Sequence, residues 1–188
     1  MISKEIINKI TEFVHSQSRA YEIPSIFQID LANEKGQELA GKLGADKDIV
    51  LLGTLLMDCM LGVASKERKS SGHIRMSEEK AEVLLSQFPE LEDKVKENIL
   101  YCVRQHHGAD KFYSLESEIC CNADCYRFAS VKGVIEGIRY LKKTMELDEL
   151  IKFYLKKADE KWNALSLEIC KKELAPQYKA IKDFLTQF

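Results

Sequence analysis

Apolar side chains recur along this chain at intervals of three and four residues, the spacing that places them on one face of an α-helix. The stretch from 3 to 17 shows this clearly, because Ile6, Ile10 and Val14 fall on one stripe. No segment of useful length alternates apolar and polar residues, and only three prolines and nine glycines interrupt the chain. The pattern therefore predicts an all-α protein.

Capping residues and helix breakers divide this pattern into separate predicted helices. Ser25 opens the second one, which runs to Leu43 and ends at Gly44, and Gln28 stands where it completes a capping box with Ser25. The later helices are expected over 46–61, 77–88 (opened by Ser77), 90–107, from about 114 to 128, 131–145, 147–165, and 166–188 with a bend at Pro176. Trp162 and Tyr178 are expected to pack this C-terminal tail onto the rest.

A chain of 188 residues is long enough for one domain with a real hydrophobic core. We expect residues 1–145 to form one helical bundle, with the chemistry confined to 25–130. Residues 146–188 are expected to form a C-terminal helical extension packed on the same domain.

The overall composition excludes several classes of partner. A formal net charge of −2 gives no electrostatic reason to expect nucleic acid or an anionic membrane. No uninterrupted apolar run reaches the roughly 18 residues of a membrane span, and the start of the chain is amphipathic rather than a signal peptide. Six cysteines without a disulfide-framework spacing indicate reduced thiols that mostly fill the core. These features predict a cytoplasmic protein.

One carboxylate interrupts the most apolar stretch of the chain, residues 51–62. A charge in such surroundings loses hydration, so Asp58 needs a partner that is a cation or a hydrogen-bond donor. Three of the four histidines, His73, His106 and His107, lie in the following fifty residues. A second carboxylate, Asp124, follows two cysteines on an apolar helix face. We expect these five side chains to converge on one divalent metal ion.

Imidazole and carboxylate ligands together suit Mn, Ni, Fe, Zn or Mg ions, so the sequence does not identify the metal. The loop before His73 is basic, and its Lys66, Arg68 and Lys69 are candidates for binding a phosphate. Each feature also has a simpler interpretation. The loop charges can be a solvated surface, and histidines at a helix C-terminus can complement the helix dipole.

Four short motifs occur in a fixed order along the chain. They are Leu55-Leu56-Met57-Asp58, then Gly72-His73, then Gln105-His106-His107-Gly108, and finally Asn122-Ala123-Asp124. This order resembles the HD superfamily of metal-dependent phosphohydrolases, whose corresponding elements are "LLHD", a histidine that precedes an "S-x-x-x-A" helix, "HH" and "ADR". The resemblance covers about 100 residues and implies an HD-domain-like helical bundle with a C-terminal helical extension.

The resemblance also implies a function and its residues. A phosphohydrolase of this family acting on a nucleotide or other small phosphate ester would use Asp58 and Asp124 in catalysis. The family's usual mononuclear site has two histidines and two aspartates, but the histidine positions are Gln28 and Met57 here, so that site is degenerate. The equivalents of a second ion's ligands, Asp58, His73, His106 and His107, are all present.

Three other interpretations stay open from the sequence. The chain could be a catalytically inactive HD scaffold or small-ligand-binding protein that holds no metal, because two ligands are lost. It could instead be an HD-type iron oxygenase, which needs two irons. Finally, Cys59, Cys120, Cys121 and Cys125 with His106 could form a zinc site, although buried thiols need no metal.

Overall fold

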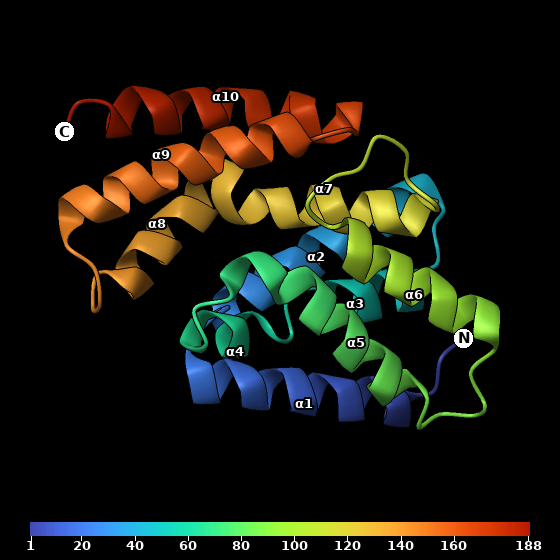
Figure 1. The fold of residues 1–188 in the computed structure, drawn as a ribbon. Helices are drawn as coiled ribbons and strands as arrows, with labels where there is room; N and C mark the ends of the chain where they lie inside the picture. Colours follow the sequence, from blue (N-terminus) through green and yellow to red (C-terminus); the bar gives the residue numbers. More distant parts are fainter.

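The computed structural model describes residues 1–188 and is built of α-helices, with one 3₁₀ turn and no strand (Figure 1). This confirms the all-α prediction. In chain order the elements are α1 (Lys4–Tyr21), α2 (Ile26–Leu43), α3 (Lys47–Leu56), α4 (Leu61–Lys66), η1 (Ser70–Gly72), α5 (His73–Leu85), α6 (Asp93–Gln105), α7 (Leu115–Ala129), α8 (Val131–Leu141), α9 (Leu147–Ala164) and α10 (Glu168–Leu185).

Both ends of α2 and the start of α7 lie where local capping chemistry predicts them. The Ser25 hydroxyl accepts the Gln28 backbone N–H while the Gln28 side chain accepts the Ser25 N–H, so the expected capping box is present. Gly44 ends α2 in the left-handed region at φ 74°, where a glycine has no steric penalty. Ser114 caps α7 in the same way as Ser25 caps α2.

The predicted helix over 46–61 is broken, and the break carries Asp58. α3 ends at Leu56, residues 57–60 form a turn, and α4 begins at Leu61. The N–H of Met60 donates to the Ser77 hydroxyl at 3.1 Å and not to the carbonyl one helical turn before it. Ser77 is therefore an interior residue of α5 that holds the turn, and the prediction that it opens a helix is wrong.

Residues 47–66 satisfy a length and composition test for a membrane-spanning helix, contrary to the expectation that no segment would. In the structure 67% of that apolar window is buried inside the protein. α3 packs against α1, α2, α6 and α7. The segment is therefore part of the buried core, and core segments of folded proteins satisfy the same test.

Helix α7 runs through the middle of the molecule, between the α1–α6 side and the C-terminal helices (Figure 1). Its side chains contribute to two hydrophobic clusters. Tyr126 belongs to the main core, which Leu165 and Leu174 of the C-terminal segment also join. Phe128 belongs to a smaller core with residues of α8, α9 and α10. The rings of Trp162 and Tyr178 stack 4.7 Å apart, and this contact joins α10 to α9.

Candidate functional site

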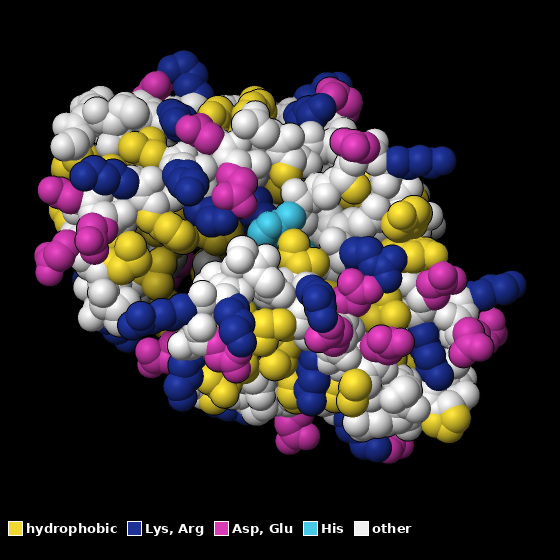
Figure 2. Space-filling view, viewed as in Figure 1, with side chains coloured by type: hydrophobic (Ala, Val, Ile, Leu, Met, Phe, Trp, Pro, Cys, Tyr) yellow, Lys and Arg dark blue, Asp and Glu magenta, His cyan; other side chains and the backbone are white.

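A cavity of about 310 Å³ lies between α2, the turn at Asp58, α7 and the C-terminal helices. Figure 2 shows the hollow on the molecular surface, with histidine atoms exposed beside it. Polar residues that line the cavity include Asp58, His73, His107, Asp124, Arg127 and Lys161. Its apolar and aromatic lining residues include Leu61, Phe128, Tyr140, Leu141, Met145 and Phe153.

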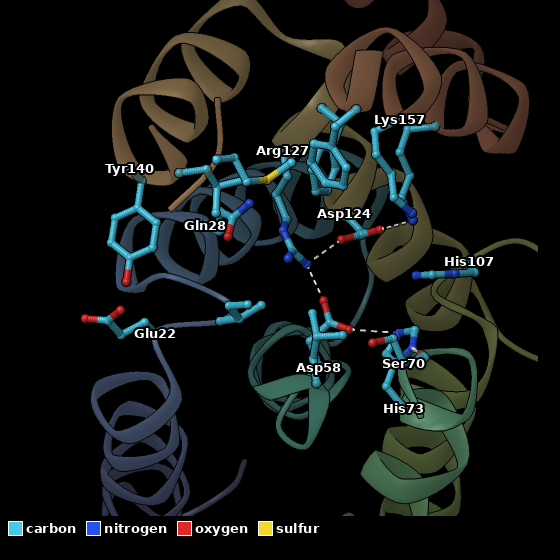
Figure 3. Close-up of a pocket in the computed structure, with 17 residues that line it drawn as sticks. Glu22, Gln28, Asp58, Ser70, His73, His107, Asp124, Arg127, Tyr140 and Lys157 are labelled. Carbon is cyan, nitrogen blue, oxygen red and sulfur yellow. Dashed lines mark hydrogen bonds and ion pairs between the residues drawn. The ribbon is translucent and has the colours of Figure 1, made fainter. Parts of the chain in front are cut away.

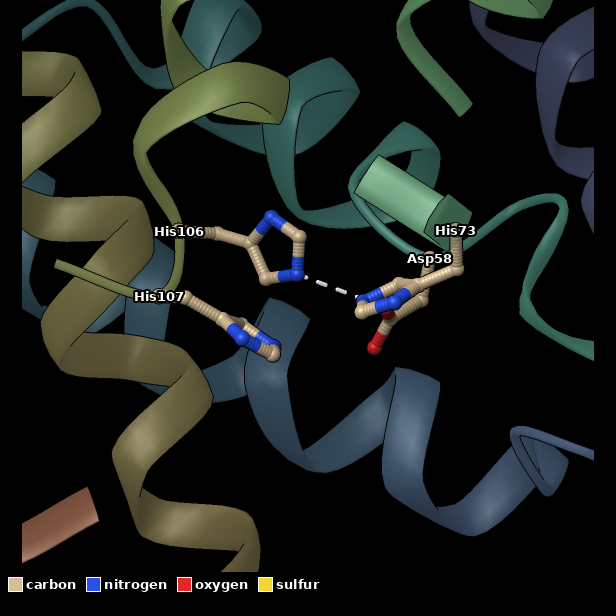
Figure 4. Close-up of side chains that lie close together, drawn as sticks. All are labelled: Asp58, His73, His106 and His107. Carbon is tan, nitrogen blue, oxygen red and sulfur yellow. Dashed lines mark ion pairs between the residues drawn. The ribbon is translucent and has the colours of Figure 1, made fainter. Parts of the chain in front are cut away.

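Four of the predicted ligands converge on one another beside the cavity (Figure 4). Asp58 comes from the turn after α3, His73 begins α5, and His106 and His107 follow α6. One ligand atom from each lies within 4.8 Å of the other three. Oδ1 of Asp58 is 3.2 Å from Nε2 of His73 and 3.3 Å from Nε2 of His106. The fold therefore brings together residues that are far apart in the sequence.

Backbone carbonyls fix which nitrogen of two histidines faces Asp58. Nδ1 of His73 lies 2.6 Å from the Ser70 carbonyl oxygen, and Nδ1 of His106 lies 2.7 Å from that of Val103. A carbonyl only accepts hydrogen bonds, so Nδ1 carries the proton in both rings. In the neutral rings both Nε2 lone pairs then point toward the Asp58 carboxylate. Metal-binding histidines are commonly oriented by such carbonyl contacts.

The cluster fits a metal ion on two observations. Oδ1 of Asp58 and Nε2 of His106 are buried and have no well-oriented hydrogen-bond partner. A tetrahedral ion with bonds of about 2.0–2.1 Å separates its ligand atoms by about 3.3 Å, which is close to the two observed separations. His107 is also suited to be a ligand, because burial, with the nearby His106 and Lys161, lowers its pKa to about 3 and keeps it neutral.

Asp124 lies outside this group of four and is held by two cations that the sequence analysis did not identify. Nη1 of Arg127 is 2.6 Å from Oδ1 of Asp124 and 2.5 Å from Oδ2 of Asp58 (Figure 3). Nζ of Lys161 is 2.5 Å from Oδ2 of Asp124. All four side chains are at most 7% exposed. Burial alone would raise the pKa of Asp124, but Lys161 and Arg127 outweigh it and hold that pKa well below its usual range.

Both missed cations leave a signal in the sequence. Arg127 stands three residues after Asp124, so the two share a face of an otherwise apolar helix. Lys161 continues the buried stripe of α9 after Tyr154 and Ala158. A charged residue on a core-facing stripe indicates a buried partner.

The two degenerate positions carry no imidazole toward the cavity. Gln28 lines the cavity, but its Oε1 accepts the Ser25 N–H at 3.1 Å in the capping box. Met57 is 1% exposed and is not among the residues that line the cavity. Neither side chain is therefore arranged as a ligand that could replace a histidine.

The expected phosphate-binding residues Lys66, Arg68 and Lys69 lie on the exposed surface before His73 and do not line the cavity. Lys69 pairs with Glu67 at 3.0 Å, and Nζ of Lys66 lies over the Tyr21 ring. The cations that line the cavity are Arg127, Lys157 and Lys161, which come from α7 and α9. Basic side chains do reach the site, but the C-terminal helix α9 supplies two of them.

The cysteines do not gather around His106. All six are buried and free. The Cys59 thiol donates toward the Ser77 carbonyl and the Cys120 thiol toward that of Val50. Burial raises the pKa of Cys59 to about 12, so it stays a neutral thiol. The interpretation as a zinc–thiolate site has no geometric support.

Comparison with solved structures identifies the architecture as the HD-superfamily fold. The chain matches a predicted HD superfamily hydrolase from an uncultured Thermotogales bacterium (TM-score 0.69, 16% identity, 96% of this chain and 90% of that one). It matches an HD-superfamily hydrolase from Bacillus thuringiensis (TM-score 0.64, 16% identity, 98% and 95%). It also matches Bacillus subtilis YpgQ in complex with ADP (TM-score 0.69, 14% identity, 96% and 94%). No family model and no curated protein matches the sequence.

Proposed function

From the HD-superfamily fold, we propose that this protein is a metal-dependent phosphohydrolase with a single divalent ion bound by Asp58, His73, His106 and His107. The observation that supports this most is the convergence of the Nε2 atoms of His73 and His106 on Oδ1 of Asp58, with the Nδ1 atom of each ring held by a backbone carbonyl. Three imidazoles and one carboxylate favour Mn, Fe, Ni or Zn over Mg.

The ion and the residues around the cavity have different roles toward the phosphate in this proposal. When bound, the ion supplies Lewis acidity and a water of lowered pKa. Arg127 and Lys161 line the cavity and are already paired with Asp58 and Asp124, so they would bind phosphate oxygens through their remaining N–H groups, and Lys157 would add a further N–H donor. Asp124 has a positioning role in this proposal. It forms ion pairs with Arg127 and Lys161, and these two cations keep it ionised and fix its orientation.

The apolar part of the cavity lining indicates the rest of the substrate. Tyr140, Phe153 and Met145 line the same cavity as the charged residues. A planar group such as a nucleobase buries well against aromatic side chains, and the cavity volume suits a small ligand. The structure of YpgQ in complex with ADP supports the same substrate class. We therefore propose a nucleotide as the substrate.

The test uses metal-stripped protein that is reloaded separately with Mn, Ni, Zn, Fe and Mg. Each form is incubated with nucleoside mono-, di- and triphosphates, and the products are separated by ion-exchange chromatography. We expect turnover with at least one ion and its loss in Asp58→Ala and His73→Ala. His15→Ala is the matched control, because that histidine lies on α1 outside the site. Absence of metal uptake and turnover in the wild-type protein would overturn the proposal.

One observation favours a second candidate, a nucleotide-binding scaffold without catalysis. Arg127 and Lys161 already compensate the two carboxylates, so the cavity does not need an ion to be stable. Burial lowers the pKa of His73, but Asp58 outweighs it and raises that pKa, which favours a metal-free ion pair. Tight ADP binding without any turnover would distinguish this candidate. The di-iron oxygenase gains no support, because it needs a second metal position.

A further inference from the structure

We propose that the Arg127 guanidinium is a built-in substitute for a second metal ion, so that this site takes one divalent cation per chain and not two. The inference extends the proposed function, since it concerns the cation position beside the proposed ion. It rests on the contacts of Asp58 and Asp124 and on the lack of further metal-ligand atoms around them.

Asp58 acts as a bridging carboxylate. Its Oδ1 faces the histidine nitrogens, whereas its Oδ2 accepts from Nη1 of Arg127 at 2.5 Å. The same Nη1 donates to Oδ1 of Asp124 at 2.6 Å. Figure 3 shows the guanidinium between the two carboxylates. One nitrogen thus occupies the point where the two aspartates would otherwise share a cation.

The other side-chain atoms that could serve as metal ligands at that point are not suited to the role. The Gln28 amide oxygen is engaged by the Ser25 N–H, and Met57 offers only a soft thioether. The other oxygen of Asp124 is taken by Lys161 at 2.5 Å. An incoming ion would have to displace the guanidinium and would then find two carboxylates and no imidazole.

The charges lead to the same conclusion. Two buried carboxylates face two buried cations, so Asp58, Asp124, Arg127 and Lys161 are balanced without a metal. The proposed ion at the histidine cluster already adds two positive charges to this balanced group, and a second divalent ion between the carboxylates would add two more in a buried site, which is unfavourable. Arginine does not lose its proton in proteins, so this cation is present whatever the metal supply.

The experiment counts bound ions. Metal-stripped wild-type protein and Arg127→Ala are titrated with Mn²⁺ by calorimetry, and free Mn²⁺ is followed by electron paramagnetic resonance. We expect one Mn²⁺ per wild-type chain and a second, weaker one in Arg127→Ala, where the two carboxylates are left unpaired. Adding Asp124→Asn to that variant returns the count to one. Arg104→Ala is the matched control, because Arg104 pairs with Glu78 away from the cavity, and it keeps the count at one.

The outcomes separate this inference from the proposed function. If the wild-type protein binds no Mn²⁺, the proposed metal site is refuted. If Arg127→Ala then binds one Mn²⁺, the result still supports the inference that the Arg127 guanidinium occupies the place of a metal ion. Two ions in the wild-type protein, or a folded Arg127→Ala that gains none, would overturn the inference. If Arg127→Ala does not fold, wild-type crystals soaked in Mn²⁺ decide the matter. Anomalous density confined to the histidine cluster supports the inference, and density between Asp58 and Asp124 overturns it.

Discussion

The Lys161 ammonium lies 2.5 Å from Oδ2 of Asp124, and both side chains are at most 2% exposed. The two residues belong to α9 and α7, so a C-terminal helix completes the charge balance of a site whose carboxylates and histidines come from residues 58–124. Burial lowers the pKa of Lys161, but Asp124 outweighs it and raises that pKa, so the lysine stays charged. The pair is therefore a fixed part of the cavity wall.

Lys161→Met is expected to destabilise the protein by about 3–5 kcal/mol, because it leaves a buried carboxylate with one cation less. Urea unfolding followed by circular dichroism measures this. Lys157→Met is the control, because Lys157 is 26% exposed and pairs only with Glu160, so its loss should cost less than about 1 kcal/mol. Equal effects of the two variants would contradict the assignment.

Acid is expected to unfold the metal-free protein through Asp124. The pKa of this carboxyl is lowered in the folded state, so its stabilising effect is fully present above the unfolded value of about 3.9 and is lost as the pH falls from there through the lower folded-state pKa. The free energy of unfolding should therefore decrease below about pH 5. Asp124→Asn, measured by urea unfolding between pH 3 and 7, should show a shallower decrease. An unchanged slope would show that other carboxyls control acid unfolding.

His73→Ala is expected to weaken metal binding by at least about 100-fold, because changes to groups that only orient a ligand already cost 10- to 100-fold. Calorimetric titration with Mn²⁺ or Zn²⁺ measures the affinity. His15→Ala should bind as the wild-type protein does. Wild-type affinity in His73→Ala would remove this residue from the site.

Tyr140→Ala is expected to raise KM for a nucleotide about tenfold with little change in kcat, because a base stacked on an aromatic ring gains about 1–3 kcal/mol. Steady-state kinetics with the best nucleotide measures both constants. Tyr113→Ala is the control, since Tyr113 is 63% exposed and outside the cavity. A fall in kcat with unchanged KM would place Tyr140 in the chemistry instead of base binding.

Gly133→Ala is expected to destabilise the protein by about 1–3 kcal/mol or more. A Cβ at this position would lie 2.5 Å from the Tyr126 carbonyl oxygen and 2.6 Å from that of Arg127, and backbone does not yield easily. Gly72→Ala has no atom within 4 Å of the new Cβ and should be nearly neutral. Thermal unfolding of both variants provides the comparison, and similar midpoints would contradict it.

The sequence by itself determined the all-α class and the helix ends that carry local caps. Ser25, Gly44 and Ser114 act on the backbone within one helical turn, so their effect does not depend on the rest of the fold. The order of the motifs also predicted that Asp58, His73, His106 and His107 meet, and in the structure one ligand atom of each lies within 4.8 Å of the others.

Only the tertiary structure decided the break at 57–60 and the identity of the cations. The break depends on a hydrogen bond from Met60 to Ser77, a residue of another helix. The positive charges at the cavity belong to Arg127 and Lys161 and not to the basic loop, because the packing of α9 on α7 determines which side chains meet. Neighbours in sequence reveal caps and periodicity, whereas the partner of a buried charge is set by how distant helices pack.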